Sequence, residues 1–557
     1  MLKKIRKHKI LLCLGLIIAT GFYLRSLNSN WDNGYYFHPD ERALIMFALP
    51  LEKPTSWDKL ISPESELNPH FFAYGSFPIY LLKGVSELAK FYDPQLGEYG
   101  SIHLVGRFLS ALFDTATIAL VFLLARRLFS PAVGLFSAFC YSVSVLPIQL
   151  SHSYAVDTLL TFFLLLSLYF ALELIDKTRI RNAIFVGIFF GTCIAIKISA
   201  LIFLPVLIFS FLYLLTHIRH ARVSFLFLIT ITCSVLTVFF LQPYSFIDFV
   251  EFKKQTLQQT SMSYNPFIFP YTLQYVGKIP YLYELRNISL WGLGLPIAIA
   301  SLAGIAILTR QVFRMGKVKN ILLLGVLLYF WLYILFFGKA AVGFMRYMLP
   351  IYPIFAIAAG FVLARIYSFA TKKLKKKYIH KKLTLVFLVF ILLIYPLSFI
   401  QIYLKPNTRI QASDWIVKNI PRGSTLAVEH WDDSLPVYNG QFYYHFSLPL
   451  YDPDTDEKWE NMDRMLDQSQ YIIIASNRLY APLQRLTDCT RLPSYRCYPR
   501  TASYYKKLFS GELGFRKIKE FSSHPIIPFT NIEINDISAD ENFTSFDHPT
   551  IMVFKKD

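Results

Sequence analysis

The sequence predicts a polytopic α-helical membrane protein with a small C-terminal α/β domain, and three observations support this prediction. Hydrophobic residues make up 54% of the 557 residues. About eleven apolar runs approach the ~20 residues that an α-helix needs to cross a ~30 Å hydrocarbon layer. After about residue 404 these runs stop, and charged residues, turns and short apolar stretches replace them. A soluble globular protein is therefore excluded.

The first apolar run covers about residues 10–27 and follows five basic residues within the first nine positions. This arrangement is similar to a signal peptide, but no small-residue cleavage site follows the run. We therefore predict a membrane anchor. The remaining predicted spans share a similar length and apolar composition, and they are residues 103–125, 131–150, 156–175, 182–200, 201–216, 223–241, 288–309, 320–338, 347–369 and 383–403.

Basic residues mark alternate connections between the predicted spans. Lys and Arg are frequent in these connections, and Asp176 is their sole acidic residue. Because positively charged loops remain in the cytoplasm, the N-terminus is predicted to be inside. With an odd number of spans, the C-terminus is then outside. The connections are residues 1–9, 126–127, 176–181, 217–222, 310–319 and 372–382.

The net charge of +19 is thus explained by membrane topology. A nucleic-acid partner is not expected, because the basic residues lie in short clusters between apolar runs rather than along one soluble face.

The predicted orientation gives the extracytoplasmic side two long loops, residues 28–102 and 242–287. In the first loop, residues 77–88 are apolar but too short to span, which favours a helix lying in the membrane interface. The second loop is rich in Tyr, Phe, Gln and Pro, as in an aromatic interfacial loop or a mobile lid. We predict a transmembrane domain over residues 1–403 and a soluble extracytoplasmic domain over residues 404–557.

The C-terminal region has the pattern of an α/β domain of roughly 150 residues. Apolar stretches at 424–430, 471–476 and 550–554 predict strands, and residues 413–419 predict a helix before a Pro-Arg-Gly turn. The motif Trp431-Asp432-Asp433 is compatible with a metal or sugar-nucleotide site, although an ordinary polar turn is favoured.

Two cysteines of this region, Cys489 and Cys497, are spaced as in a loop-closing disulfide. Whether they pair stays open at the level of sequence, because pairing also requires suitable geometry and an oxidising compartment.

Two adjacent carboxylates, Asp40 and Glu41, follow Pro39 shortly after the first span. Proline at the first helical position and acids in the first turn indicate the start of a helix. The same acids lie between His38 and Arg42, and a general base needs a carboxylate held near cationic partners. A helix start and a catalytic site are both supported, and the two interpretations are compatible.

A third acid, Asp157, lies at the predicted outer start of the span 156–175. An acid in or near an apolar span is costly unless it is paired or faces a water-filled cavity, so it is a functional candidate. The alternative is a helix cap. His152, five residues earlier, is either a metal ligand or a local hydrogen-bonding residue.

Three cations on the predicted outer side depart from the charge rule: Lys197, Lys339 and Arg346. Arg346 lies at the start of the span 347–369, where the helix dipole disfavours a cation but free backbone N–H groups favour an anion site. A bound phosphate would offset both effects. For Lys197 and Lys339 the alternative is snorkelling to lipid headgroups, and Arg107 should face the bundle or snorkel outward.

Acids and cations thus converge on one membrane face beside apolar surface. This combination suits a substrate with a lipid tail, an anionic linkage and a polar head.

Six motifs occur in the matching order and topological placement of a known group. They are FHPDER at 37–42, NPHFFAYGSFPIYL at 68–81, VGRFLSALFDTATIAL at 105–120, SHSYAVDT at 151–158, AIKIS at 195–199 and FMRYMLPIYP at 344–353. Over about residues 10–403 the chain resembles the GT-C superfamily of lipid-carrier-dependent glycosyltransferases, in particular the protein mannosyltransferase and aminoarabinose transferase-like group. The resemblance implies a GT-C fold and a sugar donor carried on polyprenyl phosphate.

The resemblance also implies roles for the candidate residues. Asp40 would be the general base, with Glu41 sharing or supporting the chemistry and Asp157 as the acid of the fourth span. Lys197 and Arg346 would bind the donor phosphate. Lys339 and Arg107 are further phosphate-binding candidates, His38, His152 and Tyr347 are other pocket candidates, and Glu41 and His152 are candidate ligands because some relatives bind a divalent metal.

The expected function is the inverting transfer of a sugar from a polyprenyl-phosphate donor to an acceptor hydroxyl of a protein, lipid or glycan on the extracytoplasmic side. The expected partners are this donor, the acceptor and membrane lipids. A transporter or flippase of lipid-linked sugars is the principal alternative, but neither repeated halves nor interrupted mid-membrane helices are evident. A non-catalytic scaffold that binds through its external domain is a second alternative.

Overall fold

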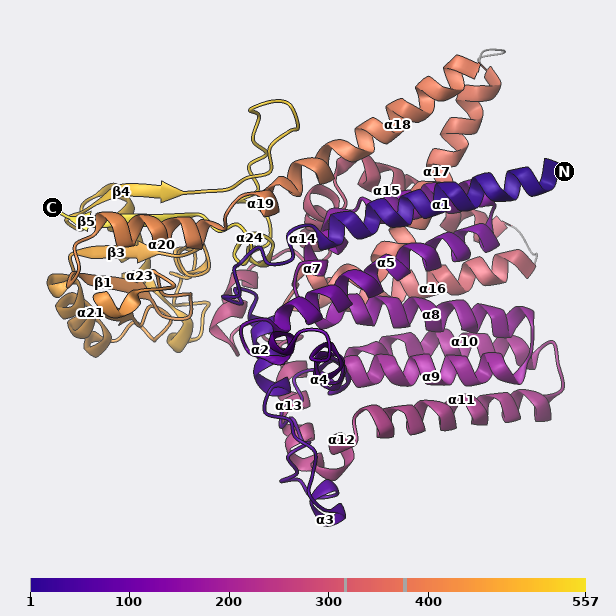
Figure 1. Ribbon diagram of the computed structural model, residues 1–557, viewed down its shortest axis with the longest axis horizontal. Helices are drawn as coiled ribbons and strands as arrows, with labels where there is room; N and C mark the ends of the chain where they lie inside the picture. Colours follow the sequence, from indigo (N-terminus) through magenta and orange to yellow (C-terminus); the bar gives the residue numbers. More distant parts are fainter. Residues whose placement is uncertain (1, 315–317, 374–377) are drawn as a thin grey trace. The chain divides into compact units, whose positions relative to one another are not determined.

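The computed structural model describes residues 2–314, 318–373 and 378–557 and divides into two compact units (Figure 1). The predicted cytoplasmic connections 1–9, 310–319 and 372–382 therefore lie partly outside the described residues. Unit 1 comprises Met1–Ser29, Pro39–Thr260 and Pro280–Pro396, and unit 2 comprises Asn30–His38, Ser261–Ile279 and Leu397–Asp557.

Unit 1 is built from long apolar helices that lie side by side in Figure 1. In the described part of the chain, nine helical segments are long and apolar enough to cross a membrane, or ten if the bent pair α6 and α7 forms one span. This confirms the predicted polytopic helical fold. The helices of these segments, together with the shorter apolar helix α9, are α1 (Leu2–Ser26), α5 (Ile102–Leu128), α6 (Pro131–Ser142), α7 (Val145–Ser151), α8 (Val156–Asp176), α9 (Ile180–Ile196), α10 (Leu204–Leu215), α11 (His220–Leu241), α15 (Leu295–Arg314), α16 (Val318–Lys339), α17 (Tyr352–Lys373) and α18 (Tyr378–Phe399).

About eleven spans were predicted, and the structure has ten in its described part when α6 and α7 are counted as one span. The difference is one helix, α9. The predicted span 182–200 corresponds to α9, which has 17 residues. At 1.5 Å per residue α9 is about 25 Å long, slightly less than the ~30 Å hydrocarbon layer. Beyond α9 the chain turns through the 3₁₀ segment η2 (Ile198–Phe203) into α10.

Small residues allow α9 and α11 to approach closely. A Cβ at Gly187 or Gly191 would collide with the backbone of α11. Across the same contact the hydroxyl of Ser234 donates to the carbonyl of Gly187 at 3.1 Å, and that of Thr230 donates to the carbonyl of Ala183 at 3.2 Å. This is the small-residue packing expected in membranes.

Several short helices form in the parts of the two predicted external loops that belong to unit 1. The predicted interfacial helix at 77–88 is confirmed as a helix by α4. In the second loop, α13 packs on the first loop, because Gln255 accepts from the N–H of Phe72 at 2.7 Å and donates to the carbonyl of His70 at 3.0 Å. The elements are α2 (Pro39–Ala48), α3 (Trp57–Leu60), α4 (Phe77–Ala89), η1 (Pro94–Gly97), α12 (Tyr244–Ile247), α13 (Phe249–Ser261), α14 (Leu282–Asn287) and η4 (Ile288–Gly292).

Unit 2 contains a five-stranded sheet in the order β2-β1-β3-β5-β4. Strands β2, β1 and β3 are parallel, and β5 is antiparallel to both β3 and β4. Predicted strands are confirmed as β1, β3 and β5 and the predicted helix as α20, whereas β2 and β4 were not predicted. The elements are α19 (Gln401–Leu404), α20 (Thr408–Asn419), β1 (Thr425–Glu429), η6 (Gly440–Phe442), β2 (Tyr444–Leu448), α21 (Asp456–Gln468), β3 (Tyr471–Ile474), α22 (Tyr480–Leu483), η7 (Ser494–Arg496), α23 (Pro499–Ser510), β4 (Phe515–Phe521), α24 (Glu541–Thr544) and β5 (Ile551–Lys556).

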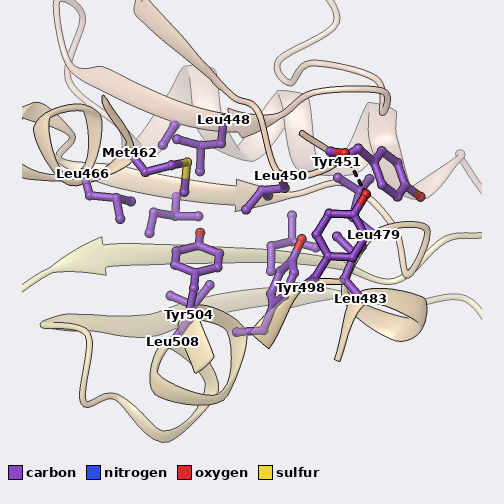
Figure 2. Packing of buried hydrophobic residues seen from close by; sticks show 14 of the residues in the cluster. Leu448, Leu450, Tyr451, Met462, Leu466, Leu479, Leu483, Tyr498, Tyr504 and Leu508 are labelled. Carbon is purple, nitrogen blue, oxygen red and sulfur yellow. Dashed lines mark hydrogen bonds between the residues drawn. The ribbon is translucent and has the colours of Figure 1, made fainter. Parts of the chain in front are cut away.

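Each face of this sheet buries its own apolar core, because successive side chains of a strand point to opposite faces. Ala427 of β1 belongs to one core, and its neighbours Leu426 and Val428 belong to the other. In Figure 2, α21 and α23 contribute Met462 and Tyr504 to the first of these cores. Leu273, from the second long loop, is part of the same core, which explains why its segment Ser261–Ile279 folds with unit 2.

Two predicted features of unit 2 are resolved by the structure. Cys489 and Cys497 form a disulfide with a Cα–Cα distance of 5.4 Å. The motif beginning at Trp431 is a turn, and its two carboxylates, Asp432 and Asp433, each lie 3.2 Å from the guanidinium of Arg409. The interpretation of this motif as a polar turn is confirmed.

A buried imidazole holds the last loop of unit 2 before β5. His548 lies 2.5 Å from Asp547 through Nδ1 and 2.9 Å from Asp536 through Nε2. Burial lowers the pKa of His548, but the two carboxylates outweigh burial and raise the pKa to about 10. Burial conversely raises the pKa of Asp536, and contact with His548 and His524 lowers it to about 2.

Candidate active site

Asp40 is held in the first turn of α2, which begins at Pro39 as the sequence predicts. Its Oδ1 accepts a hydrogen bond from the hydroxyl of Tyr74 at 2.8 Å. Its Oδ2 forms an ion pair with the guanidinium of Arg346. The side chain of Asp40 keeps 15% exposure, so the carboxylate is close to the surface of unit 1 but already engaged.

Asp157 lies in the first turn of α8 and belongs to the same group. Lys197 Nζ donates to Asp157 Oδ1 at 3.2 Å, and Arg346 Nε lies 3.9 Å from Asp157 Oδ2. The side chain of Asp157 is 2% exposed. Arg346 therefore bridges the two carboxylates, and Lys197 provides a second positive charge.

Lys197 is positioned by the end of α9, where it forms the helix C-cap in an extended conformation. A cation is favoured at this end of a helix dipole. The Nζ of Lys197 lies 4.0 Å from the ring centroid of Tyr347 and 5.6 Å from that of Tyr74. These aromatic faces favour a cation between them and keep the ammonium near Asp157.

Arg346 lies in η5 (Met345–Ile351), a 3₁₀ segment that precedes α17. The segment predicted to begin the α-helix at residue 347 is thus a 3₁₀ helix, which is wound more tightly than an α-helix. The guanidinium carbon of Arg346 is 5.1 Å from the ring centroid of Phe344 and 5.7 Å from that of Tyr347. The carbonyl of Tyr347 accepts a hydrogen bond from Tyr333 of α16 at 2.7 Å, which ties η5 to the bundle.

The four charged residues Asp40, Asp157, Lys197 and Arg346, with Tyr74 and Tyr347, are called the charged group below. Two carboxylates balance two cations, so the charged group is formally neutral. From the sequence, Lys197 and Arg346 were expected to bind the donor phosphate. The structure instead pairs both cations with carboxylates of the chain.

Glu41 and Arg107 form a separate and fully buried pair. Arg107 donates to Glu41 Oε1 at 2.9 Å and to Oε2 at 2.5 Å, and both side chains are 0% exposed. Glu41 also accepts from the backbone N–H of Tyr154 at 2.8 Å, and Arg107 donates to the carbonyl of Ser29 at 2.6 Å. The pair thus fastens the start of α2 to α5 and to the turn before α8.

The remaining predicted residues lie outside the charged group. Both ring nitrogens of His152 contact backbone carbonyls, that of Ile148 at 2.8 Å and that of Leu27 at 3.0 Å. Lys339 is an exposed residue at the end of α16. His38 belongs to unit 2, where its ring lies 4.7 Å from that of Phe546.

Sequence reasoning missed Tyr74, which contacts Asp40 through its hydroxyl and Lys197 through its ring. The adjacent Gly75 is the one feature of the sequence that could have indicated this contact. The N–H of Gly75 donates to the carbonyl of Ile196 at 2.9 Å, and a Cβ on Gly75 would collide with the carbonyl of Ala195. Because the backbone at Gly75 approaches the backbone of α9 this closely, Tyr74 lies beside the end of α9.

The described residues contain no cluster of the kind that holds a metal ion. In residues 2–314, 318–373 and 378–557, no three His, Cys, Asp or Glu side chains are grouped so that they could hold a metal ion. Glu41 is engaged by Arg107, and His152 is engaged by backbone carbonyls.

A solved oligosaccharyltransferase has a similar fold. The chain is similar to the archaeal oligosaccharyltransferase AglB from Archaeoglobus fulgidus, solved with an inhibitory peptide and a dolichol-phosphate, with a TM-score of 0.55 and 12% identity over 99% of this chain and 89% of that chain. A further match is ArnT from Cupriavidus metallidurans bound to undecaprenyl phosphate, with a TM-score of 0.45 and 14% identity over 84% of this chain and 94% of that chain. No curated protein sequence matches the chain.

The similarity to AglB shows that the two chains share a fold, in agreement with the polytopic helical membrane fold with a C-terminal α/β domain predicted from the sequence. Within this fold, residues 99–242 match the family model described as Dolichyl-phosphate-mannose-protein mannosyltransferase. The matching segment contains Arg107, Asp157 and Lys197.

Proposed function

We propose that this protein is a membrane glycosyltransferase that moves a sugar from a polyprenyl-phosphate donor to an acceptor hydroxyl, with inversion at the anomeric carbon. The observation that carries the proposal is the convergence of Asp40, Asp157, Lys197 and Arg346 from four separate segments of unit 1. Paired charges of this kind in a membrane protein mark sites that handle substrate. The reaction takes place on the extracytoplasmic side, in line with the distribution of basic connections.

The ligand of the similar AglB structure supports a lipid-phosphate donor. AglB was solved with a dolichol-phosphate. This ligand combines a long apolar chain with one phosphate, which matches the combination of tail and anionic linkage inferred for this chain. We propose that the acceptor is a protein, lipid or glycan and that unit 2 contributes to its selection.

In the proposed mechanism the donor phosphate competes with the carboxylates for Arg346 and Lys197. Arg346 presents a planar fork suited to a phosphate, and Lys197 adds a compact charge. When the guanidinium turns to the phosphate, the Asp40 carboxylate loses its ion pair and becomes available as a base. Tyr74 keeps Asp40 oriented through its hydrogen bond.

The transfer itself is a single displacement. The acceptor oxygen forms a bond to the anomeric carbon while the bond between that carbon and the phosphate oxygen breaks. The hydroxyl proton passes to Asp40, and polyprenyl phosphate leaves with its charge stabilised by Lys197 and Arg346. Asp157 holds Lys197 in place, and the buried pair of Glu41 and Arg107 positions the start of α2.

The test is a transfer assay with the purified protein in detergent. A panel of polyprenyl-phosphate sugars is supplied with water or a simple alcohol as acceptor, and release of polyprenyl phosphate is measured. Asp40→Asn should lower turnover by ~10² to 10⁴-fold, the contribution of a positioned base. It should leave donor binding in place, because Asn keeps the shape of the side chain.

Asp58→Asn provides the matched control, because Asp58 is an exposed carboxylate of the same loop. Its turnover should equal that of the unmodified protein. Turnover of Asp40→Asn within a few-fold of this control would refute the role of Asp40. A protein that moved the lipid across the bilayer without cleaving it would be a flippase, and the proposal would then be wrong.

A further inference from the structure

Unit 2 contains a surface cleft of about 310 Å³ whose lining is made only of its own residues. The cleft lies where the amino ends of β1 and β3 meet the carboxyl end of β5, because β5 is antiparallel to β3. Three of the residues that line the cleft are cationic, Arg422, Lys555 and Lys556, and none is Asp or Glu. The lining therefore carries a concentrated positive charge.

The position of Arg422 is fixed by the turn before β1. Gly423 has φ of +82° and donates its N–H to the carbonyl of Phe442 at 2.8 Å, which holds the turn against the end of η6. The guanidinium carbon of Arg422 lies 4.0 Å from the ring centroid of Phe442. Stacking restricts the guanidinium while leaving its N–H donors free to bind a ligand.

The two lysines follow each other at the end of β5 and differ in their surroundings. Lys556 Nζ donates to the carbonyls of Leu466 and Asp467 at 3.3 and 2.7 Å, so it caps α21 and keeps one N–H donor. Lys555 is exposed. Residues 397–557 are all described, and within them neither lysine forms an ion pair with Asp or Glu.

We propose that this cleft binds a multiply charged phosphate group of a water-soluble ligand, such as a diphosphate. The guanidinium fork of Arg422 and the exposed ammonium of Lys555 match an oxyanion that carries two or more charges, whereas a single carboxylate carries only one. The cleft volume admits such a group together with part of the molecule that bears it. The proposal does not depend on glycosyl transfer, since all of its residues belong to unit 2.

The experiment measures the protection of Lys555 from an amine-reactive reagent in the full-length protein in detergent. Inorganic pyrophosphate is the probe, sodium chloride at matched ionic strength is the control, and mass spectrometry gives the extent of labelling. Pyrophosphate should protect Lys555 in a saturable manner. Lys506 and Lys507, two exposed lysines of α23, serve as internal controls and should not be protected.

Arg422→Gln should raise the pyrophosphate concentration for half-protection about tenfold, the effect of losing one charge-assisted contact. Arg491→Gln, a change of the same charge at a side chain that is 86% exposed and outside the cleft, should leave it unchanged. Labelling of Lys555 that is unaffected by millimolar pyrophosphate, or protection equal to that of Lys506, would overturn the proposal. Protection by vesicles of phosphatidylglycerol but not by pyrophosphate would assign the cleft to a lipid surface and would also overturn it.

Discussion

The buried pair of Glu41 and Arg107 leads to a strong prediction about stability. Both side chains are 0% exposed, and the contact is bidentate with distances of 2.9 and 2.5 Å. Glu41→Gln keeps the shape of the side chain and an acceptor for the N–H of Tyr154, but it leaves the charge of Arg107 buried and uncompensated. Breaking a buried pair in this way costs about 3–5 kcal/mol.

The assay is thermal unfolding of the purified protein in detergent, with Glu52→Gln as an exposed control in the same loop. The midpoint of Glu41→Gln should fall by on the order of 5 °C, given the unfolding entropy of a unit of this size. Combining Glu41→Gln with Arg107→Gln removes both charges, so the double variant should lose about 0.5–3 kcal/mol less than the sum of the single losses. An unfolding midpoint of Glu41→Gln equal to that of the control, or strictly additive losses, would refute this account of the pair.

Three further predictions concern the charged group and unit 2. Arg346→Ala should weaken binding of a polyprenyl-phosphate sugar by about tenfold or more in a detergent binding assay, since one charge-assisted contact is worth roughly 1.5–3 kcal/mol; unchanged donor affinity would contradict the role of Arg346. Tyr74→Phe removes a single hydrogen bond to Asp40, so turnover should fall by only about three- to tenfold, and a loss as large as that of Asp40→Asn would mean that Tyr74 itself takes part in the chemistry. Because the pKa of His548 is raised to about 10, its stabilising contribution is complete below the unfolded pKa of about 6.5 and is lost as pH rises toward 10. Unfolding midpoints measured from pH 6 to 10 should show a larger decline in the unmodified protein than in His548→Asn, and parallel declines would rule this out.

Much of the charged group was predictable because its members are charged residues near the ends of apolar runs. Asp157, Lys197 and Arg346 stood out for the same reason, since charge near a membrane span is costly unless it is used or compensated. Asp40 was identified beside a proline that begins a helix, and the structure shows that helix. In each case a charge beside an apolar run or a helix-start signal marks the residue, so the sequence is sufficient to locate it.

Pairing between distant residues could not be predicted in the same way. Glu41 and Arg107 are separated by 66 positions, and nothing in either segment shows that they meet each other rather than a substrate. Tyr74 carries no formal charge, so no rule about membrane charges applied to it. The strand β4 was missed because its sequence, FRKIKEF, is largely charged, as suits an edge strand that must not pair with another chain.

The neutrality of the charged group has a consequence for turnover under the proposed function. After transfer, polyprenyl phosphate would be held by the same Arg346 and Lys197 that assisted its departure. Asp40 and Asp157 then act as internal competitors for those cations, because the resting structure already contains their ion pairs. When Asp40 has passed the acceptor proton on to water and these pairs form again, the carboxylates neutralise both cations in place of the phosphate. The resting arrangement therefore favours the release of spent carrier and limits inhibition by product.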